Sequence, residues 1–140
     1  MSSVKGTNMT NITATPQVNA DATQVHGRMR VWYDTYEASS LASGSDITIA
    51  RLPKGATVYG VDVMHDALGS GATLSVGDSG SATRYIGATN AVSAGQLTLS
   101  SDGNIAGFGY QNSSETDVLI TTGGGTATGT IACAVTYTVD

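Results

Sequence analysis

The most constraining feature of this chain is a strict alternation of apolar and polar side chains in two long segments. In residues 28–36, Met29, Val31 and Tyr33 occupy one set of alternate positions, and charged side chains occupy much of the other. Successive side chains of a β-strand point to opposite faces, so a period of two predicts strands with two different faces. In residues 130–139 the apolar positions are Ile131, Cys133, Val135, Tyr137 and Val139. The chain is therefore expected to be all-β.

Shorter segments of the same kind are separated by turn residues. They lie at 46–50, 58–64, 73–76, 84–86, 96–99, 106–110 and 117–121. Glycine and proline mark the turns, as in Pro53-Lys54-Gly55. Residues 38–42 are compatible with a brief helical turn, but no segment has the spacing of an amphipathic helix. Such a pattern is typical of a β-sandwich or jelly roll, here of about eight strands over residues 28–140.

The N-terminal residues 1–27 have a different composition. Close to half of them are Ser, Thr, Asn or Gln, and none is aromatic. Two interpretations stay open: an extended arm that becomes ordered by lying across a neighbouring subunit, or a flexible tail. In the first case the apolar contact points of the arm are Val4, Ile12 and Val18.

The low charge content limits the partners of this chain. Charged residues make up 12% of the sequence, about half the usual share of roughly 25%. The net charge is −5, and the six Lys and Arg residues form no basic stripe, so nucleic acid is not an expected partner. No stretch approaches the roughly 18 consecutive apolar residues of a membrane helix, so no membrane partner is expected. A surface this poor in charge suits a protein that is partly covered by other subunits.

No motif in the sequence predicts catalysis, a metal site or a cofactor. Gly77-Asp78-Ser79-Gly80 resembles the nucleophile segment of chymotrypsin-like serine proteases over four residues only, and it also has the composition of a turn. The two histidines, His26 and His65, have no second His or Cys at metal-ligand spacing. Cys133 lies in an apolar run and is interpreted as a buried hydrophobic residue. We therefore expect a protein that is not an enzyme.

The aromatic residues Trp32, Tyr33 and Tyr36 are clustered in one predicted strand. Because Trp32 and Tyr33 are adjacent, their side chains point to opposite faces, so one of them should lie outside the main core. That residue is a candidate for a protein interface, since exposed aromatic side chains often anchor such contacts. The alternative is a second covered face within the same domain.

Three segments of the chain resemble small virion structural proteins of tailed bacteriophages. These are residues 49–61, with the turn Leu52-Pro53-Lys54-Gly55, residues 73–79, which read Thr-Leu-Ser-Val-Gly-Asp-Ser, and residues 101–110. The resemblance implies a capsid decoration, or cement, protein with a β-sandwich or jelly-roll fold. It also implies a homo-oligomer, most often a trimer, that sits on the outer surface of the capsid and bridges major capsid protein subunits.

A second hypothesis is an adhesion module of a phage tail or head fibre that binds carbohydrate or a receptor. It requires two or three coplanar, exposed aromatic side chains with polar groups around them. The sequence does not exclude this arrangement.

Overall fold

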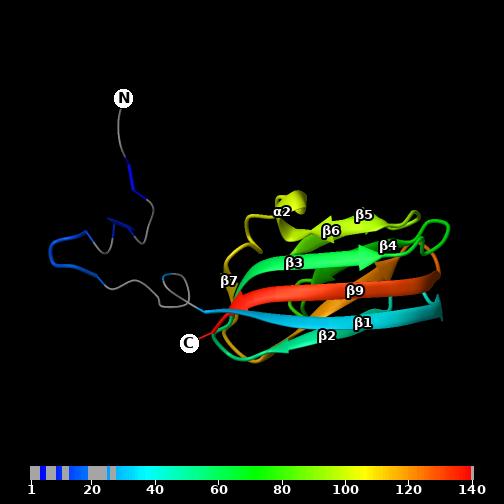
Figure 1. Cartoon of the computed structure of the whole chain (residues 1–140), viewed down its shortest axis with the longest axis horizontal. Helices are drawn as coiled ribbons and strands as arrows, with labels where there is room; N and C mark the ends of the chain where they lie inside the picture. The colour runs from blue at the N-terminus through cyan, green and yellow to red at the C-terminus, as the bar shows by residue number, and fades with distance from the viewer. Residues whose placement is uncertain (1–3, 6–8, 11–12, 19–24, 26–27, 140) are drawn as a thin grey trace.

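The computed structural model describes residues 4–5, 9–10, 13–18, 25 and 28–139. Residues 29–138 form two antiparallel sheets packed face to face (Figure 1). One short helix, α2 (Leu99–Asp102), follows β6. The strands are β1 (Met29–Leu41), β2 (Asp46–Leu52), β3 (Thr57–His65), β4 (Thr73–Gly77), β5 (Ile86–Asn90), β6 (Gly95–Thr98), β7 (Tyr110–Gln111), β8 (Thr116–Gly123) and β9 (Ala127–Thr138). The prediction of an all-β sandwich is confirmed.

The order of the strands is that of a jelly roll. The first sheet runs β1-β9-β3-β6, with the short β7 also paired to β3, and the second runs β2-β8-β4-β5. If β7 is set aside, strands pair from the two ends of the domain inward: β1 with β9, β2 with β8, β3 with β6 and β4 with β5. This is one long hairpin folded over on itself, which is how a double-sheet jelly roll is built.

The core lies between the two sheets and follows the alternation of the sequence. Along β9, Ile131, Cys133 and Val135 are buried, while the residues between them are less buried. The facing sheet contributes Val118 and Ile120 from β8. Each of these valines and isoleucines contributes about 1.5–3 kcal/mol by its removal from water. The predicted inward face of the closing strand is thus confirmed.

Three predicted elements differ from the structure. The strand expected at 84–86 begins only at Ile86 and runs to Asn90 as β5. Residues 38–42 form no helical turn: β1 continues to Leu41 through a bulge, where Ser40 has a φ of 50° and its amide donates to Thr128 Oγ1. Residues 106–109 form turns, and only Tyr110 and Gln111 pair with β3. The preceding helix α2 was not predicted, because its one turn is held by local capping that carries no periodicity.

The described part of the N-terminal segment makes local contacts. Lys5 Nζ donates to Thr13 Oγ1 over 3.0 Å, and the Thr13 hydroxyl donates to the Met9 carbonyl oxygen over 2.6 Å. The side chains of Val4 and Val18 are exposed, and Ile12 lies outside the described residues. No described helix has the length and apolar content needed to cross a membrane.

The buried thiol of Cys133 gives a direct test of the core. Burial, with a smaller effect of Asp62 and Asp34, raises the pKa of this thiol to about 12. Because only the thiolate is nucleophilic, we expect essentially no reaction with a thiol reagent at pH 8 in the native protein, and one reactive thiol per chain after unfolding in guanidinium. Complete labelling under native conditions would contradict the packing of β9.

Candidate protein interface

β1 is an edge strand with both faces exposed along most of its length. Among the described strands it pairs with β9 alone, and residues 29–37 are all exposed. Tyr33 lies opposite Ala134 and Trp32 opposite the buried Val135, so Tyr33 points outward from the sheet and Trp32 points toward the second sheet. Trp32 is nevertheless 39% exposed and Tyr33 is 65% exposed. The sequence predicted one of the two outside the core, whereas neither is fully covered within the domain.

The outer face of the first sheet carries exposed apolar side chains on β1 and β3, on either side of β9. Val31 and Tyr33 project from β1, and the neighbouring positions on β9 include the small side chains of Ala132 and Ala134. Met64 of β3 lies beside Ala132 in the same face and is 63% exposed. Because the alanine side chains of β9 are short, the side chains of Tyr33 and Met64 project beyond them. Met64 has the same parity as Asp62, which places its side chain on the outer face.

The other face of β1 borders a groove. β1 and β2 are edge strands of different sheets, and they lie side by side along one side of the sandwich (Figure 1). Trp32 points into the space between them, together with Asp34, and a cavity of about 300 Å³ opens there. Tyr36 lies on the same face of β1 and is partly exposed. The groove is lined by Trp32, Asp34, Thr48, Ile49, Ala50 and Arg51.

Arg51, at the rim of this groove, forms an ion pair with Asp117 of β8. Its Nε lies 2.7 Å from Asp117 Oδ1, and its Nη2 donates to Oδ2 over 3.1 Å. The hydrogen bond from Arg51 lowers the pKa of the Asp117 carboxyl, so the pair stays ionised at neutral pH. Both side chains face solvent, which limits the contribution of this pair to stability.

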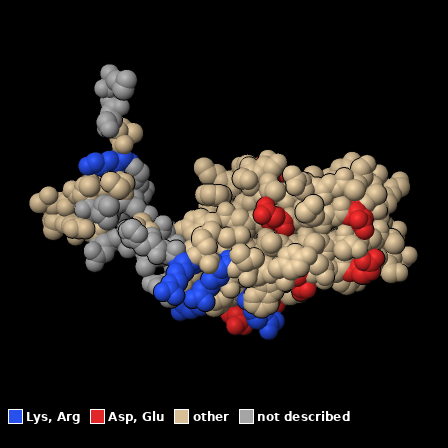
Figure 2. Space-filling model, in the orientation of Figure 1, with Lys and Arg blue, Asp and Glu red and all other residues tan. Residues whose placement is uncertain are grey.

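Charge is distributed unevenly along the sandwich. Met29 pairs with Thr138, and Thr138 pairs with Thr57, so the start of β1, the β2–β3 turn and the end of β9 share one end of the domain. Figure 2 shows Lys and Arg gathered at this end with acidic atoms beside them, and Asp and Glu along the rest of the visible face. The basic residues of this end are Arg28, Arg30, Arg51 and Lys54. The opposite end carries Glu37, Asp46 and Asp66. We call these the basic end and the acidic end.

A second apolar feature lies in the loop between α2 and β7. Ile105 is 89% exposed and Phe108 is 53% exposed, and the ring of Phe108 packs edge to face on Tyr59 at 6.1 Å between centroids. We call Ile105 and Phe108 the knob. Sequence reasoning missed the knob as a surface feature, because it assigned residues 106–110 to a strand.

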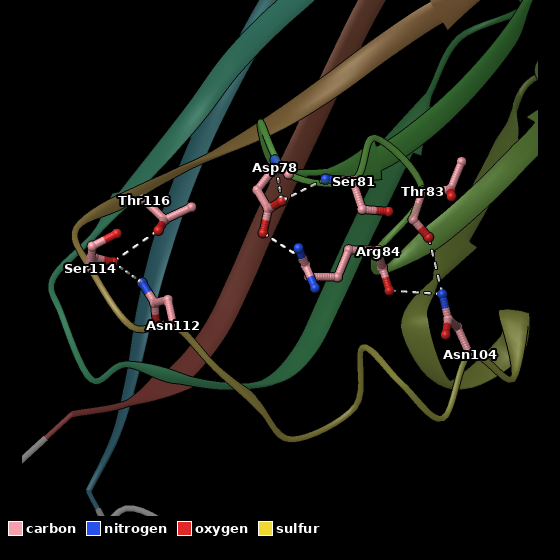
Figure 3. Close-up of polar contacts among 9 residues, drawn as sticks. Asp78, Ser81, Thr83, Arg84, Asn104, Asn112, Ser114 and Thr116 are labelled. Carbon is pink, nitrogen blue, oxygen red and sulfur yellow. Dashed lines mark hydrogen bonds and ion pairs between the residues drawn. The ribbon is translucent and has the colours of Figure 1, made fainter.

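A buried polar network anchors the knob to the domain (Figure 3). Asp78 is 4% exposed and accepts hydrogen bonds from the amides of Gly80 and Ser81 and from Arg84 Nε, the last over 2.6 Å. Asn104, next to Ile105, donates from Nδ2 to the carbonyl oxygen of Arg84 over 2.7 Å. The turn at 78–84 thus holds the loop in place.

Two further contacts of Arg84 fix the rest of the loop. Its guanidinium stacks over the ring of Tyr110, with Cζ 4.0 Å from the ring centroid. Gly107 lies so close to the Arg84 carbonyl that a Cβ there would overlap the oxygen. The loop of the knob is therefore held on Arg84 at two points, by the hydrogen bond of Asn104 and by the close packing of Gly107.

The protease-like segment serves this network. Asp78 is the acceptor of a turn, as its composition predicted, and Ser79 is an exposed turn residue after β4 in the second sheet. His65 ends β3 in the first sheet, where its Nδ1 lies 2.8 Å from the carbonyl oxygen of Asp66. The structure does not bring Ser79 and His65 together. Within the described residues, no group of three or more His, Cys, Asp or Glu side chains is placed to hold a metal ion.

The structure defines the protein as a jelly-roll module. Its edge strand β1 exposes apolar side chains, which suit contacts with other proteins. No protein-family model and no curated protein matches the chain. Among solved structures, a chain of the cyanophage Pam1 capsid asymmetric unit is 30% identical with a TM-score of 0.67, and the match covers 81% of this chain and 86% of that chain. The protein therefore belongs to the family of bacteriophage capsid proteins that includes the Pam1 chain, and it is a virion structural protein.

Two more distant phage capsids share the fold. A chain of the capsid of Ralstonia phage GP4 is 18% identical with a TM-score of 0.65, covering 81% of this chain and 86% of that one. A chain of the acidic stable capsid of Helicobacter pylori bacteriophage KHP30 is 13% identical with a TM-score of 0.62, covering 82% and 90%. The resemblance to phage virion proteins seen in the sequence is confirmed at this level.

The Asp78 network predicts a large effect of one substitution. Asp78→Ala would leave two amides and the partly buried Arg84 guanidinium without their acceptor, so we expect a loss of about 2–4 kcal/mol in the free energy of unfolding. Urea unfolding followed by circular dichroism measures this loss. The matched control is Asp46→Ala, which removes an exposed carboxylate with one hydrogen bond from Thr121 and should cost less than about 1 kcal/mol. Equal losses for the two variants would contradict the anchoring role.

Proposed function

We propose that this protein is a capsid decoration, or cement, protein that binds the outer surface of the head and bridges neighbouring major capsid protein subunits. The observation that carries the proposal is the exposed edge strand β1 on a jelly roll of a phage capsid family. Apolar side chains that a monomer leaves exposed on both faces of one strand suit a protein that is covered by neighbours in a lattice. A lattice also multiplies weak contacts, so no single contact has to be strong.

The basic end is the part of the domain that we assign to the shell. The predicted arm, residues 1–27, precedes β1 in the chain, and β1 begins at this end. On the outer sheet face, Met29, Val31 and Tyr33 begin at the same end. A surface with apolar side chains and a basic rim fits a partner surface with apolar patches and carboxylates. The acidic end then points away from the shell.

The protein bridges two capsid subunits because its domain and its arm contact different ones. The domain contacts one capsid subunit through β1, and the arm reaches a neighbouring subunit through Val4, Ile12 and Val18 by strand addition or by docking in a groove. Both contacts must break before the shell opens under the pressure of packaged DNA. Decoration therefore raises the force or temperature that the head withstands.

The adhesion hypothesis is less well supported by the geometry. Alternation places Tyr33 on the outer face of β1 and both Trp32 and Tyr36 on the groove face. The three aromatic side chains thus form no common platform on which a sugar ring could stack. Binding of the isolated protein to a glycan array, without binding to shells, would favour adhesion over decoration.

The arm is tested by deleting residues 2–25. If the arm crosses a neighbouring subunit, the truncated protein should bind undecorated shells at least about tenfold more weakly, because one of two linked contacts is lost. Co-sedimentation with shells assembled without this protein measures the affinity. An unchanged circular dichroism spectrum and melting temperature would show that the domain is intact. Unchanged affinity would overturn the role of the arm and leave decoration by the domain standing.

The basic end is tested by a charge substitution. Arg28→Gln with Arg30→Gln should weaken shell binding by about twofold to tenfold at low salt and reduce its salt dependence, since exposed charges are screened by ions. The matched control is Asp46→Asn with Asp66→Asn at the acidic end, which should bind like the wild type. Equal effects of both double variants would contradict the proposed orientation on the shell.

A further inference from the structure

The open edge of β1 is the longest strand edge that the described domain leaves unpaired. β1 has 13 residues, whereas the other edge strands β2, β5 and β6 have seven, five and four. In an antiparallel ladder every second residue directs its amide and carbonyl away from its neighbour. β1 therefore presents backbone donors and acceptors on the side away from β9 (Figure 1). Its ladder with β9 is regular from Met29 to Ala38, where a bulge begins, so this part can accept one further strand.

Two charged side chains of this edge have no ion-pair partner in the described part of the chain. Arg30 and Asp34 lie on the groove face of β1 and are exposed. They are four residues apart, about 13 Å along a strand, and form no ion pair with each other or with another described residue. Asp34 accepts a hydrogen bond from the amide of Thr35. The cation that the second sheet contributes to the groove, Arg51, is bound to Asp117. β1 thus offers one cation and one carboxylate to a partner.

The order of side chains in β1 is self-complementary about Trp32. A second β1 that runs antiparallel across a two-fold axis at Trp32 places Arg30 of each copy opposite Asp34 of the other. On the outer face the same register places Val31 opposite Tyr33, an apolar pair. Each of these pairs joins residues of the same parity, so both copies keep the same outer face. By symmetry the ion pair and the apolar pair each form on both sides of the axis.

Neighbouring registers lack this match. Moving the axis one residue later, to Tyr33, places Asp34 opposite Trp32. Moving it one residue earlier places Arg30 opposite Trp32 and leaves Asp34 to Arg28, which precedes β1. An axis at Arg30 or at Asp34 places like charges opposite each other, which destabilises a sheet. The axis at Trp32 is thus the one that neutralises both charges within β1.

We propose that two copies of this chain pair along β1 as an antiparallel dimer with its two-fold axis at Trp32. The two first sheets then form one continuous sheet, and the open edges satisfy each other's backbone groups. The outer faces, with Met29, Val31 and Tyr33 of both copies, lie side by side and stay open. The inference rests on the proposed function for its setting, since the joined faces give a larger surface for the shell. It gives a dimer, whereas the resemblance to phage proteins implies a trimer most often.

Cysteine cross-linking tests the register, and the buried native thiol of Cys133 keeps the background low. Trp32→Cys chains should link to themselves under mild oxidation, because residues at the axis lie within the Cα separation of about 4.4–6.8 Å that a disulfide needs. A mixture of Val31→Cys and Tyr33→Cys chains should link to each other, whereas either alone should link at least about tenfold less. This mixture also serves if Trp32→Cys does not fold. Val92→Cys, an exposed apolar position outside β1, is the matched control and should not link to itself.

Charge reversal tests the pairs of Arg30 with Asp34. Arg30→Asp or Asp34→Arg should weaken the dimer by about tenfold or more, because either places like charges opposite each other on both sides of the axis. The variant with both substitutions restores opposite charges and should regain the wild-type affinity within about threefold. Sedimentation equilibrium measures these affinities. Asp62→Arg, which changes an exposed carboxylate of β3 in the same sheet, is the matched control and should dimerise like the wild type.

The cross-linking is run on the free protein at high concentration and on decorated shells. Decorated shells with none of the β1 links, on the shell or in solution, overturn the two-fold contact and leave the proposed function standing. A free trimer that forms none of these links overturns the contact as well. A double charge variant that associates no more tightly than the single ones overturns the axis at Trp32. A linked dimer that does not bind undecorated shells overturns the proposed function and leaves the contact standing.

Discussion

The structure depends on the pairing of its first strand with its last. β1 and β9 are matched from Met29 opposite Thr138 to Leu41 opposite Ala127, and this antiparallel ladder completes the first sheet of the jelly roll. The same ladder brings the start of β1, the β2–β3 turn and the end of β9 to one end of the domain. It also leaves the second edge of β1 open, because among the described strands nothing pairs with it beyond β9. The most exposed surface of the molecule is thus a consequence of how the fold closes.

Alternation along β1 gives that open strand two separate surfaces. Tyr33 belongs to the outer sheet face, and Trp32 belongs to the groove beside β2. The two surfaces therefore consist of different side chains, and a partner can cover one of them without covering the other. An edge strand is usually protected by charge or by a covering element. Here the exposed side chains of residues 29–37 include five large apolar or aromatic ones, which suits an edge that is covered after assembly.

The knob is exposed for a different structural reason. Its loop is fixed by Asp78 through Arg84 and by Asn104, so the exposure of Ile105 and Phe108 does not come from a loose connection. A rigid apolar projection loses little conformational freedom when it is buried in a partner, which favours association. The buried carboxylate of Asp78 lies in the turn that resembles a nucleophile segment, and through Arg84 it fixes the loop of the knob.

Local patterns were enough to predict much of the fold. The period of two located most strands and the inward face of β9 with Cys133, since the face on which a strand side chain lies depends only on its parity. The short motifs around Leu52 and Asp78 also indicated a phage virion protein. Parity likewise separated Trp32 from Tyr33, but it carried no information on whether either face would be covered.

Whether a strand face is buried depends on which strands lie at the edges of the sheets. The edges are set by pairings between residues about one hundred positions apart, such as Met29 with Thr138. The groove, the basic end and the knob arise from the same long-range closure, because each combines segments that are distant in the chain. Residues 99–109 carry no period at all, and their conformation follows from Arg84 and Asn104. Periodicity therefore determined the strands and their faces, whereas the exposed surfaces were decided by tertiary pairing, since burial is a property of neighbours in space.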